Sequence, residues 1–203
     1  MSSTAAYRVG GRQQRSVLTR ARIVTAVRAL LAEGSFHRST VDVVAERAGI
    51  ARATLYQHFG SRLELLQAAC DSFLANPSLV AVEDSVVLPD PSEALVETIW
   101  NFTGFWASED EVLAQVYGVA AIDPAARDFV DRQRADRRAS VERLVSHLRG
   151  LKALKPKLTD KRAVALLMTL TSYETYRELC MAGLSERKVE KTLRQTAREL
   201  LLA

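Results

Sequence analysis

The stretch Thr40–Phe59, TVDVVAERAGIARATLYQHF, decides the fold of this 203-residue chain. Two helices joined by a tight turn cross at a steep angle, so the crossing needs a small residue and the left-handed turn position favours glycine. Ala45 and Gly49 occupy these two places. Apolar residues that can point inward recur before, within and after the turn, at Val44, Ala48, Ile50 and Leu55. This spacing is typical of a helix-turn-helix.

The remaining faces of this stretch carry polar side chains suited to phosphates and base edges. They are Arg52, Thr54, Tyr56, Gln57 and His58. The charge distribution agrees, because residues 1–76 hold ten arginines, no lysine and five acidic residues, a net charge of +5, whereas residues 77–203 carry a net charge of −1. This asymmetry favours a polyanion-binding module joined to a nearly neutral one, with a solubilising basic surface as the alternative.

The helix start and stop signals along the chain predict helices throughout. Prolines fall only between periodic stretches, and capping signals recur, which predicts nine helices, no strand and an all-α fold. Residues 76–91 are interpreted as an irregular linker. We therefore expect three parts: a mobile N-terminal arm at residues 1–15, a helix-turn-helix domain at residues 16–76, and a second helical domain at residues 77–203.

Composition restricts the class of protein. Apolar residues make up 48% and charged residues 26% of the chain, as is usual for a soluble globular protein. The two cysteines, Cys70 and Cys180, are 110 positions apart, which favours a reducing cytoplasmic location. We expect no signal peptide and no membrane partner, because no apolar run approaches the ~20 residues that span a bilayer.

The segment from Thr19 to about Phe73 resembles the TetR family of transcriptional regulators. The matching positions are Thr19, Arg20, Ile23, Gly34, Phe36, Thr40, Val41, Ala45, Ala48, Gly49, Ile50, Thr54, Leu55, Tyr56, Phe59, Ser61, Arg62, Leu65 and Leu66. The rest of the chain matches in architecture only. The resemblance implies a nine-helix fold in which a three-helix DNA-binding domain precedes a helical domain for ligand binding and dimerisation.

The resemblance also implies individual DNA contacts. Thr40 would hold a phosphate at the start of the second helix, and Arg52 and Thr54 would face the major groove from the third. The further phosphate contacts that it implies are Tyr56, His58 and Arg62. The chain departs from the family at Ala51, where a capping serine is common, and at Ala53, where glycine is common.

The arginines near the N-terminus have two open interpretations. Arg8, Arg12 and Arg15 are candidates for an arm that reaches the minor groove. Arg20, Arg22 and Arg28 are interpreted as a solvated helix face.

The second domain contains aromatic residues on more than one side of a single helix, among them Trp100 and Trp106. The resemblance implies a ligand cavity here, and mostly apolar walls suit an apolar or aromatic small molecule. The alternative is a packed aromatic core. The candidate pocket residues are Trp100, Phe102, Trp106, Tyr117, Met168, Tyr173 and Tyr176.

The last two predicted helices carry apolar stripes that must be buried. Family members pair two such helices from each subunit in a four-helix bundle, which implies a homodimer. The candidate interface residues are Leu170, Val189, Leu193 and Leu200.

These features predict a ligand-responsive DNA-binding transcriptional regulator, a repressor that a small effector releases from a palindromic operator on double-stranded DNA. The alternatives are a small helical enzyme and an architectural DNA-binding protein. The sequence lacks GxSxG, HExxH, GxGxxG and P-loop motifs, and its three histidines lack metal-ligand spacing. We therefore expect no catalytic residue, no metal ligand and no cofactor.

Overall fold

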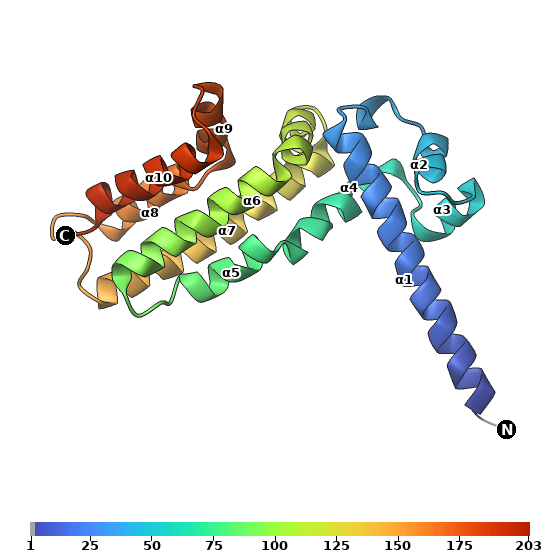
Figure 1. Ribbon diagram of the computed structural model, residues 1–203, viewed down its shortest axis with the longest axis horizontal. Helices are drawn as coiled ribbons and strands as arrows, with labels where there is room; N and C mark the ends of the chain where they lie inside the picture. Colours follow the sequence, from blue (N-terminus) through green and yellow to red (C-terminus); the bar gives the residue numbers. More distant parts are fainter. Residues whose placement is uncertain (1–2) are drawn as a thin grey trace. The chain divides into compact units, whose positions relative to one another are not determined.

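The computed structural model describes residues 3–203, with the side chains of residues 13–124 and 126–203. These residues form ten α-helices and two 3₁₀ helices (Figure 1). In chain order they are α1 (Ser3–Ala32), η1 (Phe36–Arg38), α2 (Val41–Arg47), α3 (Arg52–His58), α4 (Arg62–Asp71), η2 (Ser72–Ala75), α5 (Pro77–Ser85), α6 (Pro91–Ala120), α7 (Pro124–Gly150), α8 (Asp160–Leu170), α9 (Tyr173–Met181) and α10 (Glu186–Leu201). The predicted all-α class is confirmed, since β structure within this range is limited to one isolated bridge, but the described residues form ten α-helices where nine were predicted.

The chain divides into two compact units. The first contains the residues up to Ser72 together with Glu111–Phe129, and the second contains Phe73–Asp110 together with Val130–Ala203. Each unit has its own buried apolar core. Fully buried residues of the first include Ile23, Leu31, Leu55, Phe59 and Leu65, and those of the second include Leu95, Ile99, Phe105, Trp106 and Leu144.

The helix α1 begins at Ser3, within the segment where the sequence predicts a mobile arm. Residues 1–2 and the side chains of Arg8 and Arg12 lie outside the described part of the chain. The proposed contact of these arginines with the minor groove therefore stays a prediction.

The predicted linker at residues 76–91 contains a helix, α5, so this interpretation is wrong. Asn76 is its N-cap, with a side-chain oxygen that accepts a hydrogen bond from the Ser78 N–H at 3.0 Å, and Pro77 takes the first helical position. Proline fits there because its missing N–H would have no partner within the helix. The helix is anchored by the buried Ser85 hydroxyl, which lies 3.1 Å from the Thr98 hydroxyl. The Asn76-Pro77 pair therefore starts a helix and does not mark an irregular linker.

The helix α6 is continuous, although Ser108 and Glu111 predict a new start within it. The Ser108 hydroxyl donates to the Phe105 carbonyl oxygen at 3.0 Å, one turn back along the same helix. A hydroxyl used in this way does not cap a helix, because a cap must accept from the N–H groups that follow it. The capping pattern alone therefore does not fix a boundary.

Thr159 is a start signal and Gly183 a stop signal, which predict a single helix between them, but the chain breaks into α8 and α9. The break is held by buried donors: Arg137 donates to the Met168 carbonyl at 2.6 Å and to the Thr171 hydroxyl at 3.1 Å, and Trp106 Nε1 donates to the Thr171 carbonyl at 3.0 Å. The last carbonyls of a helix have no partner within it, so these donors stabilise the end of α8. Ser172 then caps α9.

Within the described range, no single helix is long and apolar enough to cross a membrane. Residues 62–75 and 77–85 meet that length and composition test only when taken together as a bent pair.

The apolar stripe of α10 is buried inside the chain itself. Val189 and Leu193 are 0% and 2% exposed, and α10 packs against α8 and α9. An apolar stripe on one side of a helix is covered by one packing surface, and here α8 and α9 of the same chain provide that surface. This corrects the placement of Val189 and Leu193 in a dimer interface. Leu200 remains 41% exposed and Leu170 is half-buried, so both stay candidates.

We predict that Leu193→Ala destabilises the chain, because it removes a buried side chain and leaves a cavity. The expected loss of unfolding free energy is about 2–5 kcal/mol, measured by urea denaturation. Leu151→Ala is the matched control: the same substitution at an exposed position should cost less than about 1 kcal/mol. Equal losses for the two variants would contradict the burial of the stripe.

Candidate nucleic-acid interface and cavities

The turn between α2 and α3 depends on glycine. Gly49 has φ +63°, and a Cβ built on it would lie 2.7 Å from Nη2 of Arg22. The same nitrogen donates to the Gly49 carbonyl oxygen at 3.0 Å, and the Ile50 N–H donates to the Ala45 carbonyl at 3.0 Å. A side chain at position 49 would be strained by its backbone angle and would displace Arg22. These contacts fix how α3 leaves α2.

The two ends of α3 are held differently. Ala51 is the N-cap and makes no side-chain capping bond, as its methyl group dictates. At the other end Phe59 is buried, and the guanidinium of Arg20 lies 4.3 Å from the centroid of its ring. Arg20 also donates to the His58 carbonyl at 3.5 Å. The helix is therefore anchored at its C-terminal end by α1, although its first turn lacks a side-chain cap.

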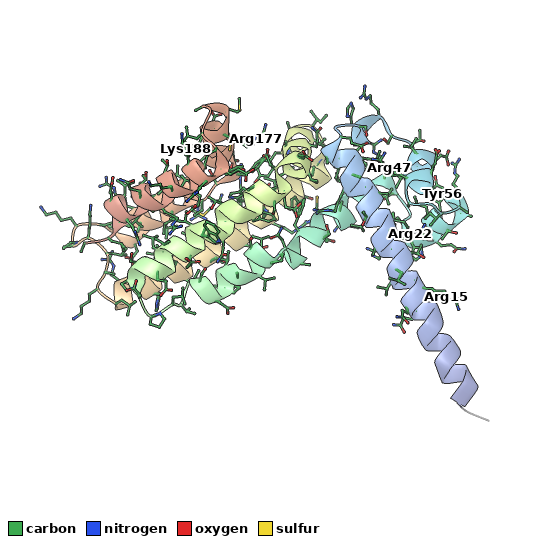
Figure 2. The ribbon with its side chains drawn as sticks, in the orientation of Figure 1. Arg15, Arg22, Arg47, Tyr56, Arg177 and Lys188 are labelled. Atoms are coloured by element: carbon green, nitrogen blue, oxygen red, sulfur yellow. The ribbon has the colours of Figure 1, made fainter. Side chains whose placement is uncertain are left out.

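The exposed side of α3 carries a three-residue arrangement. Nη1 of Arg52 lies 3.0 Å from Oδ2 of Asp42, and its guanidinium lies 5.6 Å from the centroid of the Tyr56 ring. Interaction with the Tyr56 hydroxyl and then with the Asp42 charge raises the pKa of Arg52. Figure 2 shows Tyr56 projecting from α3. Because an exposed ion pair contributes only ~0–1 kcal/mol, Arg52 can readily exchange Asp42 for another anion.

Arg62 does not lie free at the start of α4. It donates to the Ser39 carbonyl at 3.1 Å and to the Phe36 carbonyl, and its guanidinium lies 4.6 Å from the centroid of the Phe36 ring. In this conformation it ties α4 to the residues just before Thr40, which caps α2 by accepting from the Val43 N–H. Arg62 is therefore placed as a positioning residue, and its direct contact with phosphate stays a prediction.

Four of the six predicted contact residues lie on α3, Thr40 caps α2, and Arg62 begins α4. Thr40, Arg52 and Tyr56 are exposed, whereas Thr54 and His58 are half-buried. Sequence reasoning did not find Asp42, and it interpreted Arg22 as part of a solvated helix face, whereas both residues orient this surface. Each meets its partner across ten or more residues, at a separation that no local motif specifies.

The second unit contains a cavity of about 580 Å³ between α5, α6 and α7, the α5–α7 cavity. Phe102 and Trp106 form part of its apolar wall. Charged and polar side chains line the rest, namely Glu83, Asp84, Gln133, Asp136, Arg137, Ser140 and Arg143. Among them Ser140 donates to Glu83 Oε1 at 3.3 Å. The cavity can enclose an apolar body and offer it polar partners at the edge.

A second cavity, of about 550 Å³, lies between α6, α9 and α10, the α6–α10 cavity. Trp100 and Tyr176 line it, so the predicted pocket is divided in two. The reason is helical geometry: Phe102 and Trp106 are four residues apart and share a face, whereas Trp100 lies six residues before Trp106 and on a different face.

Three predicted pocket residues line neither cavity. Tyr117 falls in the first unit, and Met168 contributes its carbonyl to the end of α8. Tyr173 is a core residue, whose hydroxyl donates to Oδ1 of Asp110 at 2.7 Å. Burial, followed by the Asp110 carboxylate, raises the pKa of Tyr173, so its hydroxyl keeps its proton as a donor. Among the described residues no cluster of three or more histidines, cysteines or acids could hold a metal ion.

Residues 23–69 match the family model described as "Bacterial regulatory proteins, tetR family". The chain carries the TetR-family N-terminal domain. The match contains α2, α3 and all six predicted DNA-contact residues. A 57-residue segment is 33% identical to the HTH-type transcriptional activator FasR of Mycolicibacterium smegmatis, and covers 28% of this chain and 26% of that relative.

Solved structures extend the likeness in fold to about nine tenths of the chain. The SmeT–triclosan complex matches with a TM-score of 0.72 at 17% identity, over 91% of this chain and 92% of the other. A Saccharomonospora viridis protein solved in complex with choline also has a TM-score of 0.72, at 19% identity over 91% and 97% of the two chains. At these identities the likeness shows a shared fold only.

Proposed function

We propose that this TetR-type chain is a DNA-binding transcriptional regulator whose second unit binds a small effector. The observation that carries the proposal is the exposed Arg52–Tyr56 arrangement on α3, in a segment that matches the family. The excess of positive charge in residues 1–76 supports binding to a polyanion. Among the relatives, FasR is named an activator and SmeT a repressor. We propose repression, because occupancy of an operator requires no contact beyond DNA.

The DNA contact follows from an exchange of anions. Arg52 leaves Asp42 and binds a base edge or a phosphate, while Thr40 and Tyr56 supply hydroxyl groups beside it. Arg62 maintains the segment before Thr40 through the Phe36 and Ser39 carbonyls. The geometry of α2 is thus set before DNA arrives.

We predict that Arg52→Ala weakens binding to DNA by about 1–3 kcal/mol, because a charged donor to the groove is lost. A duplex is first enriched from a random library with the wild-type protein, and affinity is then measured by titration at fixed salt. Arg132→Ala is the control, because it removes an equal charge from an exposed position of α7 in the second unit. Equal affinities for both variants would exclude Arg52 from the interface.

We further propose a homodimer that reads a palindromic operator. Two recognition helices one DNA turn apart, ~34–36 Å, would then fit successive major grooves. The exposed Leu200 and the half-buried Leu170 support an interface on α8 and α10. Burying such exposed apolar surface stabilises association.

We predict that Leu200→Glu yields monomers, because a carboxylate in an apolar interface would lose its hydration without gaining a partner. Sedimentation velocity measures the oligomer, and circular dichroism should show an intact fold. Leu151→Glu, at another exposed position of the same unit, should remain dimeric. A Leu200→Glu dimer as stable as the wild type would place the interface elsewhere.

The α5–α7 cavity is the proposed effector site, and its ligand is an apolar or aromatic small molecule. Trp106 and Arg137 both line this cavity and hold the break between α8 and α9. An effector that contacts either residue can therefore bias the helices that follow. If the effector binds one arrangement better than the other, DNA affinity changes by that difference.

We predict that Ala139→Phe, which fills the α5–α7 cavity, abolishes the response to an effector. A panel of apolar and aromatic compounds is screened by thermal shift, and stabilising compounds are tested for release of the selected duplex. Ala135→Phe places the same ring one turn earlier on α7, outside the cavity, and should respond normally. A full response in Ala139→Phe would locate the effector elsewhere.

A further inference from the structure

The α6–α10 cavity contains an arginine seated on an aromatic ring. The guanidinium carbon of Arg194 lies 5.9 Å from the centroid of the Trp100 ring, and Arg194 forms an ion pair with Glu190. Trp100 is 49% exposed, although it is the larger of the two aromatic residues lining this cavity. A cation over an indole face and beside a carboxylate is stabilised by both. The Arg194 guanidinium thus occupies a position suited to a cation.

We propose that the α6–α10 cavity is a binding site for an organic cation, which takes the place of the Arg194 guanidinium over Trp100. This site is separate from the α5–α7 cavity and does not depend on binding to DNA. The ligand class is a quaternary ammonium or arylammonium compound, because its charge would lie on Trp100 and its apolar part would extend along the cavity.

The carboxylates of the cavity are arranged to receive a positive charge. Glu186, Glu190 and Arg194 succeed one another at intervals of four residues, so they lie along one face of α10. The Glu190 side chain is only 14% exposed, whereas that of Arg194 is 33% exposed. Within residues 13–124 and 126–203, the Glu186 carboxylate makes no hydrogen bond or ion pair. When Arg194 turns to solvent, both carboxylates can face the ligand.

The remaining wall leaves room for the body of the ligand. Thr103, Gly104 and Ala107 are small residues on the α6 side, and Tyr176 closes the α9 side with a second aromatic ring. The volume of about 550 Å³ is within the usual range for small-molecule sites.

Charge argues against an anion at the same place. The charged residues that line the cavity are Glu186, Arg187, Glu190 and Arg194, so its formal charge is balanced. An anion would have to separate Arg194 from Glu190 and then lie beside the Glu190 carboxylate. An organic cation instead keeps Glu190 paired and releases the more exposed partner, Arg194, to water.

Calorimetric titration of the full-length chain with phenyltrimethylammonium tests the proposal. Its neutral carbon isostere, tert-butylbenzene, has the same shape without the charge, and benzoate supplies the opposite charge. We expect saturable binding of the cation, at least about tenfold tighter than either comparison compound. Equal affinity for the isostere would overturn the proposal in favour of plain apolar binding. Absence of saturation at about 10 mM cation would overturn it outright.

Variants distinguish a cation site from an anion site, because the two predict opposite changes in affinity when Arg194 is replaced. Trp100→Leu and Glu190→Gln should each weaken cation binding about tenfold, whereas Arg194→Gln should strengthen it severalfold because the internal competitor is gone. Lys191→Gln, at an exposed residue of α10 outside the cavity, is the control and should change nothing. Loss of binding in Arg194→Gln, with benzoate preferred in the wild type, would overturn the proposal.

The outcome is independent of the proposed regulatory function. Arg52→Ala, which tests DNA binding, should leave cation affinity unchanged, because Arg52 lies in the first unit. A chain that binds the selected duplex but no organic cation would refute this inference alone.

Discussion

The left-handed turn at Gly49 is the constraint on which the DNA-facing surface depends. Its φ of +63° directs the chain from α2 into α3, and Arg22 from α1 occupies the space that a side chain would need. The same guanidinium satisfies the Gly49 carbonyl, so the turn is held by a contact from outside the motif. Because α3 is anchored at its far end by Phe59, the positions of Arg52 and Tyr56 follow from these two fixed points.

An analogous constraint organises the second unit at Thr171. A helix that stops inside a protein must satisfy its last carbonyl groups, since no water is available to do so. Trp106 and Arg137 perform this task from two other helices, α6 and α7. Both side chains also line the α5–α7 cavity. A ligand in that cavity would therefore contact the same donors that hold the end of α8.

The sequence predicted the features that depend on near neighbours. The turn at Gly49, the cap at Thr40 and the helical class follow from residue types at short spacing. It misplaced features that depend on the tertiary partner: α5 was interpreted as a linker, and Ser108 as a helix start. The stripe of Val189 and Leu193 was correctly expected to be buried. The local sequence does not determine whether helices of the same chain or of a second chain cover it. Likewise, the aromatic residues of α6 were assigned to one pocket, although their positions around the helix place Trp100 on a different face from Phe102 and Trp106.

Two arginines in different units show the same arrangement with opposite consequences. Arg52 lies over Tyr56 and pairs with Asp42, and Arg194 lies over Trp100 and pairs with Glu190. In the first pair the arginine and aspartate side chains are 61% and 56% exposed, so separating them costs little and either can be re-solvated. In the second, the glutamate is much the more buried partner. Because the Glu190 carboxylate is less exposed than Arg194, it keeps less contact with water when the pair separates, so Arg194 is the partner that the proposed cation replaces, whereas Arg52 is free to exchange its anion. Burial of the carboxylate therefore decides which member of each pair an incoming ligand replaces.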